Sequence, residues 1–173
     1  MICLQKWKRG IVIMNVIKEL IAIARAAVIA ALYIVICGVF APISFGPVQF
    51  RIAEALAVLP YFTSSAVPGL FIGCMLSNLL YGGLGVLDLV LGSLATLSAA
   101  YLTRRIKNKY LAMLPPVLIN AVVIGFVLNK ALGEPYIIAA LQVLLGQAVV
   151  CYAIGVPLMF LLERYGMQLF GER

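Results

Sequence analysis

The chain has 173 residues, of which 65% are hydrophobic and 11% are charged, and its formal net charge is +7. A mean hydropathy of +1.14 is far above that of a soluble domain, so the composition predicts one all-α integral membrane domain over residues 1–173. The basic residues gather at the ends of apolar runs, which fits orientation in a lipid bilayer and argues against a nucleic-acid partner. Histidine is absent and the four cysteines are scattered, so we expect no metal site, no cofactor and no disulfide framework.

Six apolar segments are predicted as membrane helices. The first, Leu20–Phe40, has the ~20 residues that a crossing needs. The second and third are short, and the stretch Thr63–Gly69 is predicted to break the chain between them. Short interrupted segments often line the substrate site of a transporter. The remaining segments, in order, are Ile52–Phe62, Leu70–Leu80, Val86–Leu102, Leu111–Leu128 and Tyr136–Leu162.

Lysine and arginine concentrate in the N-terminal region, in residues 104–109 and in the C-terminal tail. The positive-inside rule therefore predicts that these three parts, both termini included, are cytoplasmic. Six crossings satisfy this charge distribution, and so does a re-entrant hairpin formed by the second and third segments. The apolar run after the basic N-terminus is too long for a signal-peptide core, so we expect no cleavage; Met1 and Met14 both remain possible starts.

Small residues recur at helical spacing in two segments. Ala22, Ala26 and Ala30 form one row in the first segment, and Ala27 and Ala31 form a second pair beside it. This spacing lets helices approach closely, either for internal packing or for docking of a partner. The similar row Gly69, Gly73 and Ser77 in the third segment favours internal packing.

Three ionisable residues lie near the predicted outer ends of apolar segments. Arg51 and Glu54 are three residues apart and share a helix face, so they either neutralise each other at the interface or form the polar wall of a ligand cavity. The second interpretation is favoured because ionisable groups in membrane segments are costly and usually functional. Asp88 is either a helix-end acid favoured by the helix dipole or a carboxylate that accepts two N–H bonds from a heterocycle, and partial hydration is expected there.

Amides and aromatic side chains extend the candidate site. Gln142 and Gln147 are five residues apart, about 140° around a helix, so both face one site only if the helix is irregular near Gly146. The aromatic residues near Pro42–Phe50 form either an interfacial belt or a stacking surface, and this loop is predicted to act as a lid. The predicted ligand-binding residues are Phe45, Gln49, Phe50, Arg51, Glu54, Asn78, Asp88, Asn120, Gln142 and Gln147.

No Walker motif and no nucleophile–base pair is present. The chain is therefore not expected to be an enzyme, and any ATP-driven step is expected in a partner.

Three stretches, FGPVQFRIAEALAVLP, VPGLFIGCMLSNLLYGGLG and LDLVLGSLATL, resemble the QueT family, which is assigned to uptake of queuosine precursors. More broadly, the whole chain resembles the substrate-binding S components of energy-coupling factor (ECF) transporters. The resemblance implies a six-helix fold in a bacterial cell membrane with an outward-facing site. It also implies docking through Ala27 and Ala31 to a T component that carries two ATPases.

The same resemblance suggests ligand roles. Asp88, Gln142 and Gln147 stand where thiamin-binding relatives carry ligand contacts, although the absence of histidine departs from those relatives. A 7-deazaguanine presents N–H donors and an oxygen acceptor, which a carboxylate and amides would match, and Glu54 would meet the cation of an aminomethyl precursor. Two alternatives remain: an S component for another vitamin, and a structural or assembly membrane protein whose polar residues only pack helices.

Overall fold

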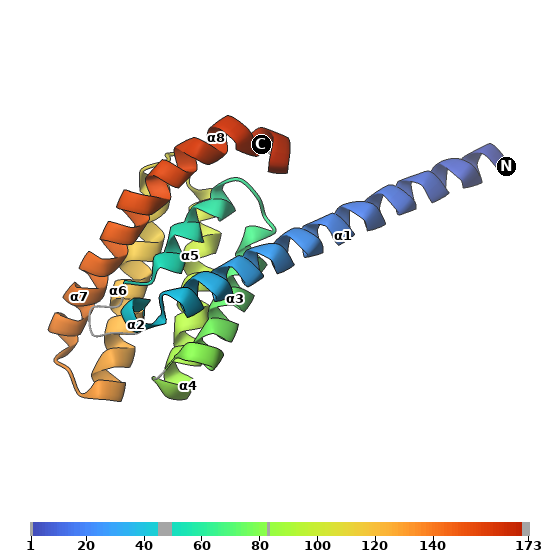
Figure 1. Cartoon of the computed structure of the whole chain (residues 1–173). Helices are drawn as coiled ribbons and strands as arrows, with labels where there is room; N and C mark the ends of the chain where they lie inside the picture. The colour runs from blue at the N-terminus through green and yellow to red at the C-terminus, as the bar shows by residue number, and fades with distance from the viewer. Residues whose placement is uncertain (1, 45–49, 83, 171–173) are drawn as a thin grey trace.

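The computed structural model describes residues 2–44, 50–82 and 84–170, and the side chains of residues 12–44, 50–82 and 84–165. Every element in this described part is a helix (Figure 1), as the composition predicts. In chain order the elements are α1 (Ile2–Val39), α2 (Ala41–Ser44), η1 (Ile52–Tyr61), α3 (Ala66–Tyr81), α4 (Gly85–Leu87), η2 (Asp88–Gly92), α5 (Ser93–Arg105), η3 (Leu111–Met113), α6 (Leu114–Leu132), α7 (Tyr136–Val149), η4 (Val150–Gly155) and α8 (Val156–Phe170).

Four helices within the described residues are long and apolar enough to cross a membrane. They are Val12–Val39, Gly85–Arg105, Leu111–Leu132 and Tyr136–Tyr165. The remaining two apolar helices, Ile52–Tyr61 and Ala66–Tyr81, are shorter and coincide with the two short segments predicted from the sequence. The structure thus supports four crossings by length, and the count of six stays a prediction.

Helix η1 runs through the middle of the bundle. It is a 3₁₀ helix of ten residues, although such helices rarely exceed four residues because their hydrogen bonds are poorly aligned. It contacts α1, α3, α5, η4 and α8, and most of its residues, Glu54 among them, are buried. Packing on all sides therefore compensates for the poor backbone geometry of this segment.

The break predicted at Thr63–Gly69 is shorter than expected. Helix α3 already begins at Ala66, so Pro68 lies in its first turn. Proline is tolerated there because the N–H groups of the first turn have no partner within the helix. The prediction that this whole stretch interrupts the chain is therefore wrong for residues 66–69.

Helices α1 and α3 pack closely along their small residues. A Cβ atom placed on Gly69 would lie 2.8 Å from the Ala26 carbonyl oxygen, and one on Gly73 would lie 2.8 Å from the Tyr33 Cβ. These distances are too short for any side chain, so both glycines are required by the close approach of the two helices. The prediction that the glycine row serves internal packing is confirmed.

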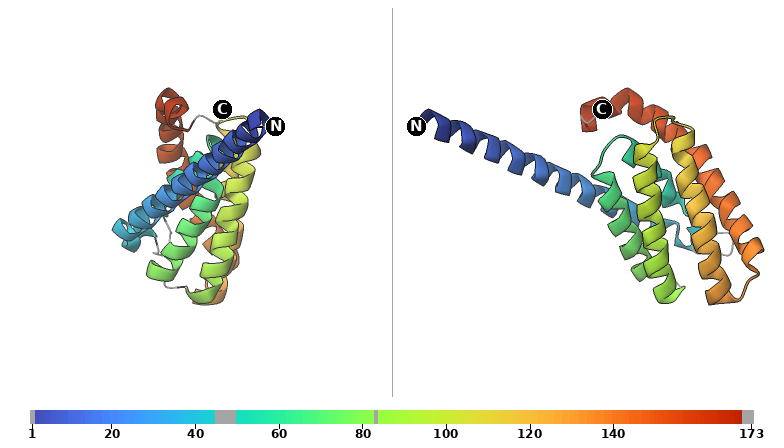
Figure 2. Two further views of the ribbon diagram at one scale, coloured as in Figure 1. Left: turned by 90° about the vertical axis from the view of Figure 1, so that its right-hand side faces the viewer. Right: turned by 180° about the vertical axis from the view of Figure 1, so that it is seen from behind.

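The two ends of the bundle differ in charge. Figures 1 and 2 show the connection between α5 and η3 at the same end of the bundle as the C-terminal part of α8, while the α3–α4 and α6–α7 turns lie at the opposite end. The first of these ends carries the basic residues 104–109. Gly133 closes α6 at the other end with φ +75°, a left-handed conformation that glycine adopts without strain. The N-terminal part of α1 projects beyond the bundle (Figure 2).

Candidate functional site

A buried ion pair lies at the centre of the polar residues. Nη2 of Arg51, directly before η1, donates hydrogen bonds of 2.9 and 3.0 Å to the two carboxylate oxygens of Asp88. The two side chains are only 2% and 1% exposed. Removing a charge from water costs several kcal/mol, and only a well-placed partner offsets this cost. The partner of Arg51 thus comes from 37 residues further along the chain, on η2.

The backbone around Asp88 is shaped to hold this carboxylate. Asp88 begins the π-helical turn η2, a winding that is frequent at functional sites. The Nδ2 atom of Asn78 donates a 3.0 Å hydrogen bond to the Asp88 carbonyl oxygen. A Cβ atom on Gly92 would lie 2.7 Å from Oδ1 of Asp88 and 3.0 Å from Nδ2 of Asn78. The absence of a side chain at Gly92 therefore provides room for the carboxylate and the amide.

Glu54 forms the second charged position of the site. The hydroxyl of Tyr33 on α1 donates a 2.7 Å hydrogen bond to Oε1 of Glu54. The hydroxyl of Thr96 on α5 lies 3.4 Å from the same oxygen and 3.3 Å from the Cys74 sulfur. All four side chains are buried. Hydroxyl groups from α1 and α5 therefore surround the Glu54 carboxyl inside the bundle.

Buried amides beside Glu54 have unused hydrogen-bonding capacity. Asn120 on α6 is 0% exposed and lies near Glu54, yet neither its Oδ1 nor its Nδ2 has a hydrogen-bond partner among the described residues. Gln147 on α7 is 1% exposed; its Oε1 lies 3.9 Å from the Cys151 sulfur, and its Nε2 has no partner in the described part of the chain. Each buried polar group without a partner costs about 1–3 kcal/mol. Such groups call for an explanation, and a bound ligand is one.

The structure brings six of the ten predicted site residues together. Arg51, Asp88 and Asn78 form one connected group, and Glu54, Asn120 and Gln147 form the adjoining one, in which the Cys151 sulfur lies 4.0 Å from the Glu54 carbonyl oxygen. We call these six residues the polar cluster. Gln142 is half-buried on another face of α7 and has an unpartnered Oε1 among the described residues. Phe50 is half-buried, and Phe45 and Gln49 lie outside the described residues, as does most of the predicted lid.

Of two expectations about charge, one is corrected and one is extended. Asp88 was expected to be partly hydrated near a helix end, but the structure buries it. The second expectation allowed Arg51 and Glu54 to neutralise each other as a pair; Nη2 of Arg51 donates its hydrogen bonds to Asp88, so Asp88 is a further partner beside the electrostatic interaction of Arg51 with Glu54. Sequence reasoning also missed Tyr33 and Thr96. A tyrosine in the middle of an apolar helix was an available signal, because a buried hydroxyl needs a partner.

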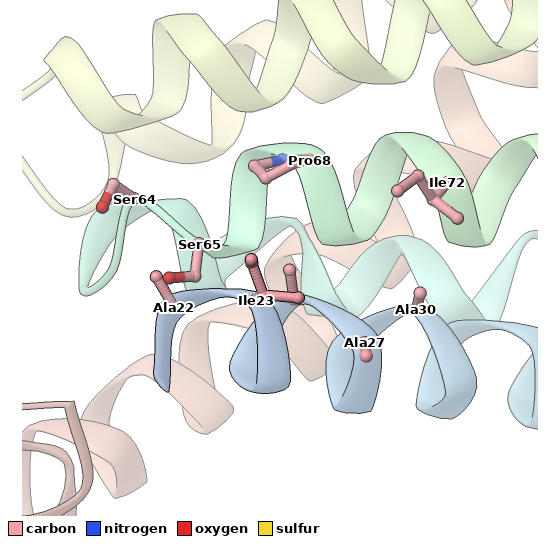
Figure 3. Close-up of a pocket in the computed structure, with 9 residues that line it drawn as sticks. Ala22, Ile23, Ala27, Ala30, Ser64, Ser65, Pro68 and Ile72 are labelled. Atoms are coloured by element: carbon pink, nitrogen blue, oxygen red, sulfur yellow. The ribbon is translucent and has the colours of Figure 1, made fainter. Parts of the chain in front are cut away.

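Two of the pockets among the described residues are lined partly by α1. One of about 500 Å³ lies between α1 and α3 (Figure 3) and is lined in part by Ala26, Ala27 and Ala30. Ala30 is buried and Ala26 is half-buried against α3, whereas Ala27 and Ala31 are exposed. The row Ala22–Ala26–Ala30 therefore serves internal packing at Ala26 and Ala30, and docking at Ala27 and Ala31 stays a prediction.

Comparisons with known proteins place the chain in a family. The QueT transporter family matches residues 23–164, which is most of the chain and includes the whole polar cluster. The queuosine precursor transporter QueT of Lactococcus lactis subsp. cremoris (strain MG1363) is 36% identical over 77 residues, which make up 43% of this chain and 44% of that protein. The aligned part thus spans less than half of that relative. No solved structure matches the chain. The match over residues 23–164 shows that the chain belongs to the QueT transporter family.

Proposed function

We propose that the chain is the substrate-binding S subunit of an ECF transporter and takes up a 7-deazaguanine precursor of queuosine. Its family membership and its long apolar helices make it a multi-pass membrane protein, and the similar Lactococcus lactis protein is named a queuosine precursor transporter. The proposal adds six crossings, cytoplasmic termini, a bacterial cell membrane, and a T component with two ATPases that supply the energy.

The observation that carries the proposal is the polar cluster. In a membrane protein, buried charges and amides are costly and are retained mainly for function. The polar cluster combines a carboxylate, Asp88, with two amides, Asn120 and Gln147, that have unused hydrogen-bonding atoms among the described residues. The N–H donors of a 7-deazaguanine would bind Asp88, and its exocyclic carbonyl oxygen would accept from an amide. Glu54 would receive the cation of an aminomethyl precursor.

A thermal-stability panel tests the proposal. The purified protein is melted with and without a set of 7-deazaguanines, with thiamin and other vitamins as the comparison set. A ligand that binds only the folded state raises the melting temperature by mass action, so we expect stabilisation by a 7-deazaguanine and none by the vitamins. Stabilisation by a vitamin alone would favour an S component with another substrate. No stabilisation by either set would favour a structural role for the polar residues.

Asp88→Asn tests the role of the carboxylate in the same protein. Asparagine keeps the shape but presents a donor where the ligand needs an acceptor, and a hydrogen bond to a charged group contributes about 1.5–3 kcal/mol. Titration calorimetry should therefore show affinity reduced by roughly tenfold or more. Glu163→Gln, at a partly exposed acid far along the chain, is the matched control. Binding by folded Asp88→Asn within about twofold of the parent would assign Asp88 a structural role only.

Two further parts of the proposal rest on α1 and on the loop after it. Leucine at both Ala27 and Ala31 should reduce co-purification with the T component and leave ligand affinity unchanged, because a bulky residue prevents close helix approach. An unchanged yield of the complex would contradict the docking assignment.

The segment Pro42–Phe50 is proposed as a lid, so a ligand should protect it from proteolysis or labelling. Equal accessibility with and without ligand would contradict this assignment.

A further inference from the structure

One nitrogen of Arg51 occupies the place on Asp88 from which a ligand would bind. Nη2 lies 2.9 Å from Oδ1 and 3.0 Å from Oδ2, so it is almost equidistant from both oxygens. An atom in this position lies between the two oxygens, in the mouth of the carboxylate. A ligand with two parallel N–H donors approaches a carboxylate through the same mouth.

The Oδ1 side of this carboxylate is crowded by its own neighbours. Gly92 approaches Oδ1 so closely that no Cβ fits between them. The Asn78 amide lies on that side as well, where it binds the Asp88 carbonyl oxygen. Because Nη2 of Arg51 already binds both oxygens, a group with two parallel donors cannot bind across the same two oxygens without displacing it.

The guanidinium of arginine and the ligand class proposed above share one chemical unit. The 2-amino-4-oxopyrimidine ring of a 7-deazaguanine carries N1–H and an exocyclic amine on one carbon, so its donor edge is itself a guanidine. Both groups present N–H donors to an acceptor-only carboxylate. Arg51 is thus a chemical stand-in for the edge of the ligand that Asp88 would bind.

We propose that Arg51 is a built-in competitor: it holds Asp88 in the ligand-free protein, and the ligand displaces it. This inference rests on the proposed function. Glu54, three residues further on, interacts electrostatically with Arg51 and provides the displaced cation with a neighbouring carboxylate when the ligand is a 7-deazaguanine without an aminomethyl group. Binding is then an exchange of partners on Asp88, which leaves neither charge in the core without compensation.

The exchange predicts that removal of Arg51 tightens binding. A ligand that binds only a minor conformation, here the one in which Arg51 has left Asp88, has its apparent affinity reduced in proportion to the population of that conformation. Arg51→Ala abolishes the competitor, so titration calorimetry should give a dissociation constant for the 7-deazaguanine at least about fivefold lower than in the parent. Arg105→Ala, which removes an exposed arginine paired with Tyr101, is the matched control and should bind like the parent.

Methylguanidinium provides the second arm of the test. In Arg51→Ala it should refill the mouth of Asp88, raise the melting temperature and compete with the 7-deazaguanine. In the parent and in Arg105→Ala, methylguanidinium should have none of these three effects, because Arg51 already occupies the carboxylate. Equal or weaker ligand binding by folded Arg51→Ala would overturn the inference and make Arg51 a ligand contact or a structural residue. If the parent itself binds no 7-deazaguanine, the proposed function fails instead, so the two failures are distinguishable.

A measurement on the parent keeps the inference testable if Arg51→Ala does not fold. Side-chain NMR of protein labelled with ¹⁵N-arginine, with Arg51→Lys used for assignment, follows the guanidinium directly. Saturation with the 7-deazaguanine should shift the Arg51 resonance and leave that of Arg105 in place. An Arg51 resonance that is unchanged at saturation would overturn the exchange.

Discussion

Two ion pairs in this chain have similar chemistry and different surroundings. Lys109, in the connection between α5 and η3, and Glu163, on α8, lie 2.6 Å apart with side chains 37% and 32% exposed. Arg51 and Asp88 lie 2.9 Å apart and are 2% and 1% exposed. The shorter pair, Lys109–Glu163, is partly exposed to solvent. The longer pair, Arg51–Asp88, is enclosed by helices in what we expect to be a membrane-embedded core.

Burial rather than distance therefore decides what each pair contributes. Water screens the exposed pair, whose partners remain well solvated when apart, so its loss is tolerated. In the buried pair neither partner can be removed without leaving an uncompensated charge. The buried pair thus constrains the ligand-free structure strongly, and a ligand that replaces one partner can change that structure.

Breaking the buried pair should have the largest effect on stability. Arg51→Met leaves the Asp88 carboxylate without its cation, and loss of one partner of a buried pair costs roughly 3–5 kcal/mol. The free energy of unfolding in detergent, measured by denaturant titration, should fall by this amount. The double variant Arg51→Met/Asp88→Leu, in which neither charge remains, should recover most of the loss. A single variant as stable as the parent would show that water reaches this pair.

Removing the hydroxyl of Tyr33 should have the next largest effect. Tyr33→Phe deletes the 2.7 Å hydrogen bond to Glu54 and should lower the free energy of unfolding by about 1.5–3 kcal/mol. Tyr101→Phe, at an exposed tyrosine of α5, serves as its control. Equal stability of the two variants would mean that Thr96 alone satisfies the Glu54 carboxyl.

A side chain at Gly92 should disturb the Arg51–Asp88 pair, because Gly92 lies directly against the Asp88 carboxylate. The Cβ of Gly92→Ala would meet Asp88 Oδ1 at 2.7 Å, and such overpacking typically costs 1–3 kcal/mol. At Gly155, also in a π-helical turn, a Cβ would meet its nearest atom, the Met113 sulfur, only at 3.4 Å. Gly155→Ala should therefore be well tolerated. Melting temperatures compare the two, and equal losses would show that the π-helical turns themselves, rather than the carboxylate, are sensitive.

Breaking the exposed pair should have the smallest effect. The hydrogen bond to Glu163 raises the pKa of Lys109 above its ordinary value of 10.5, so any stabilisation is fully present below pH 10.5 and is lost as the pH rises through the raised pKa. At neutral pH the melting temperature of Lys109→Ala should equal that of the parent within experimental error, and high salt should remove any difference between them. A clear loss at high salt would mean that contact of Lys109 with the Phe160 ring contributes more than its charge.

Four helical segments could be predicted because each contains a long apolar run bounded by charged or glycine-rich turns. The start of the first was predicted too late, at Leu20, because α1 continues through the basic N-terminal region from Ile2. The run Gly85–Arg105 differs from its prediction only at the ends. The 3₁₀ winding of η1 could not be predicted, since Ile52–Leu59 is compatible with an α-helix and Pro60 disfavours one only near the end; the tertiary packing around it decides its form. The start of α3 was missed because proline and glycine near a helix start are also typical of a loop.

The polar cluster could be predicted in its membership but not in its pairing. Arg51, Glu54 and Asp88 were recognisable because each is a charge beside an apolar run. That Arg51 binds Asp88 depends on how η1 and η2 cross, which spacing along the chain does not specify. Thr96 was missed because a threonine in a membrane helix commonly bonds to its own backbone and gives no signal of its own.

The winding of η1 also sets its length. A 3₁₀ helix rises about 2.0 Å per residue, so its ten residues cover about 20 Å. The same residues wound as an α-helix, at 1.5 Å per residue, would cover about 15 Å. Rewinding η1 would therefore shorten it by about 5 Å, which exceeds the 2.9 Å between Arg51 and Asp88. With the C-terminal end of η1 held in place by the core, a change of pitch alone would therefore shift the backbone at Arg51 by more than the length of the hydrogen bond that this residue donates to Asp88.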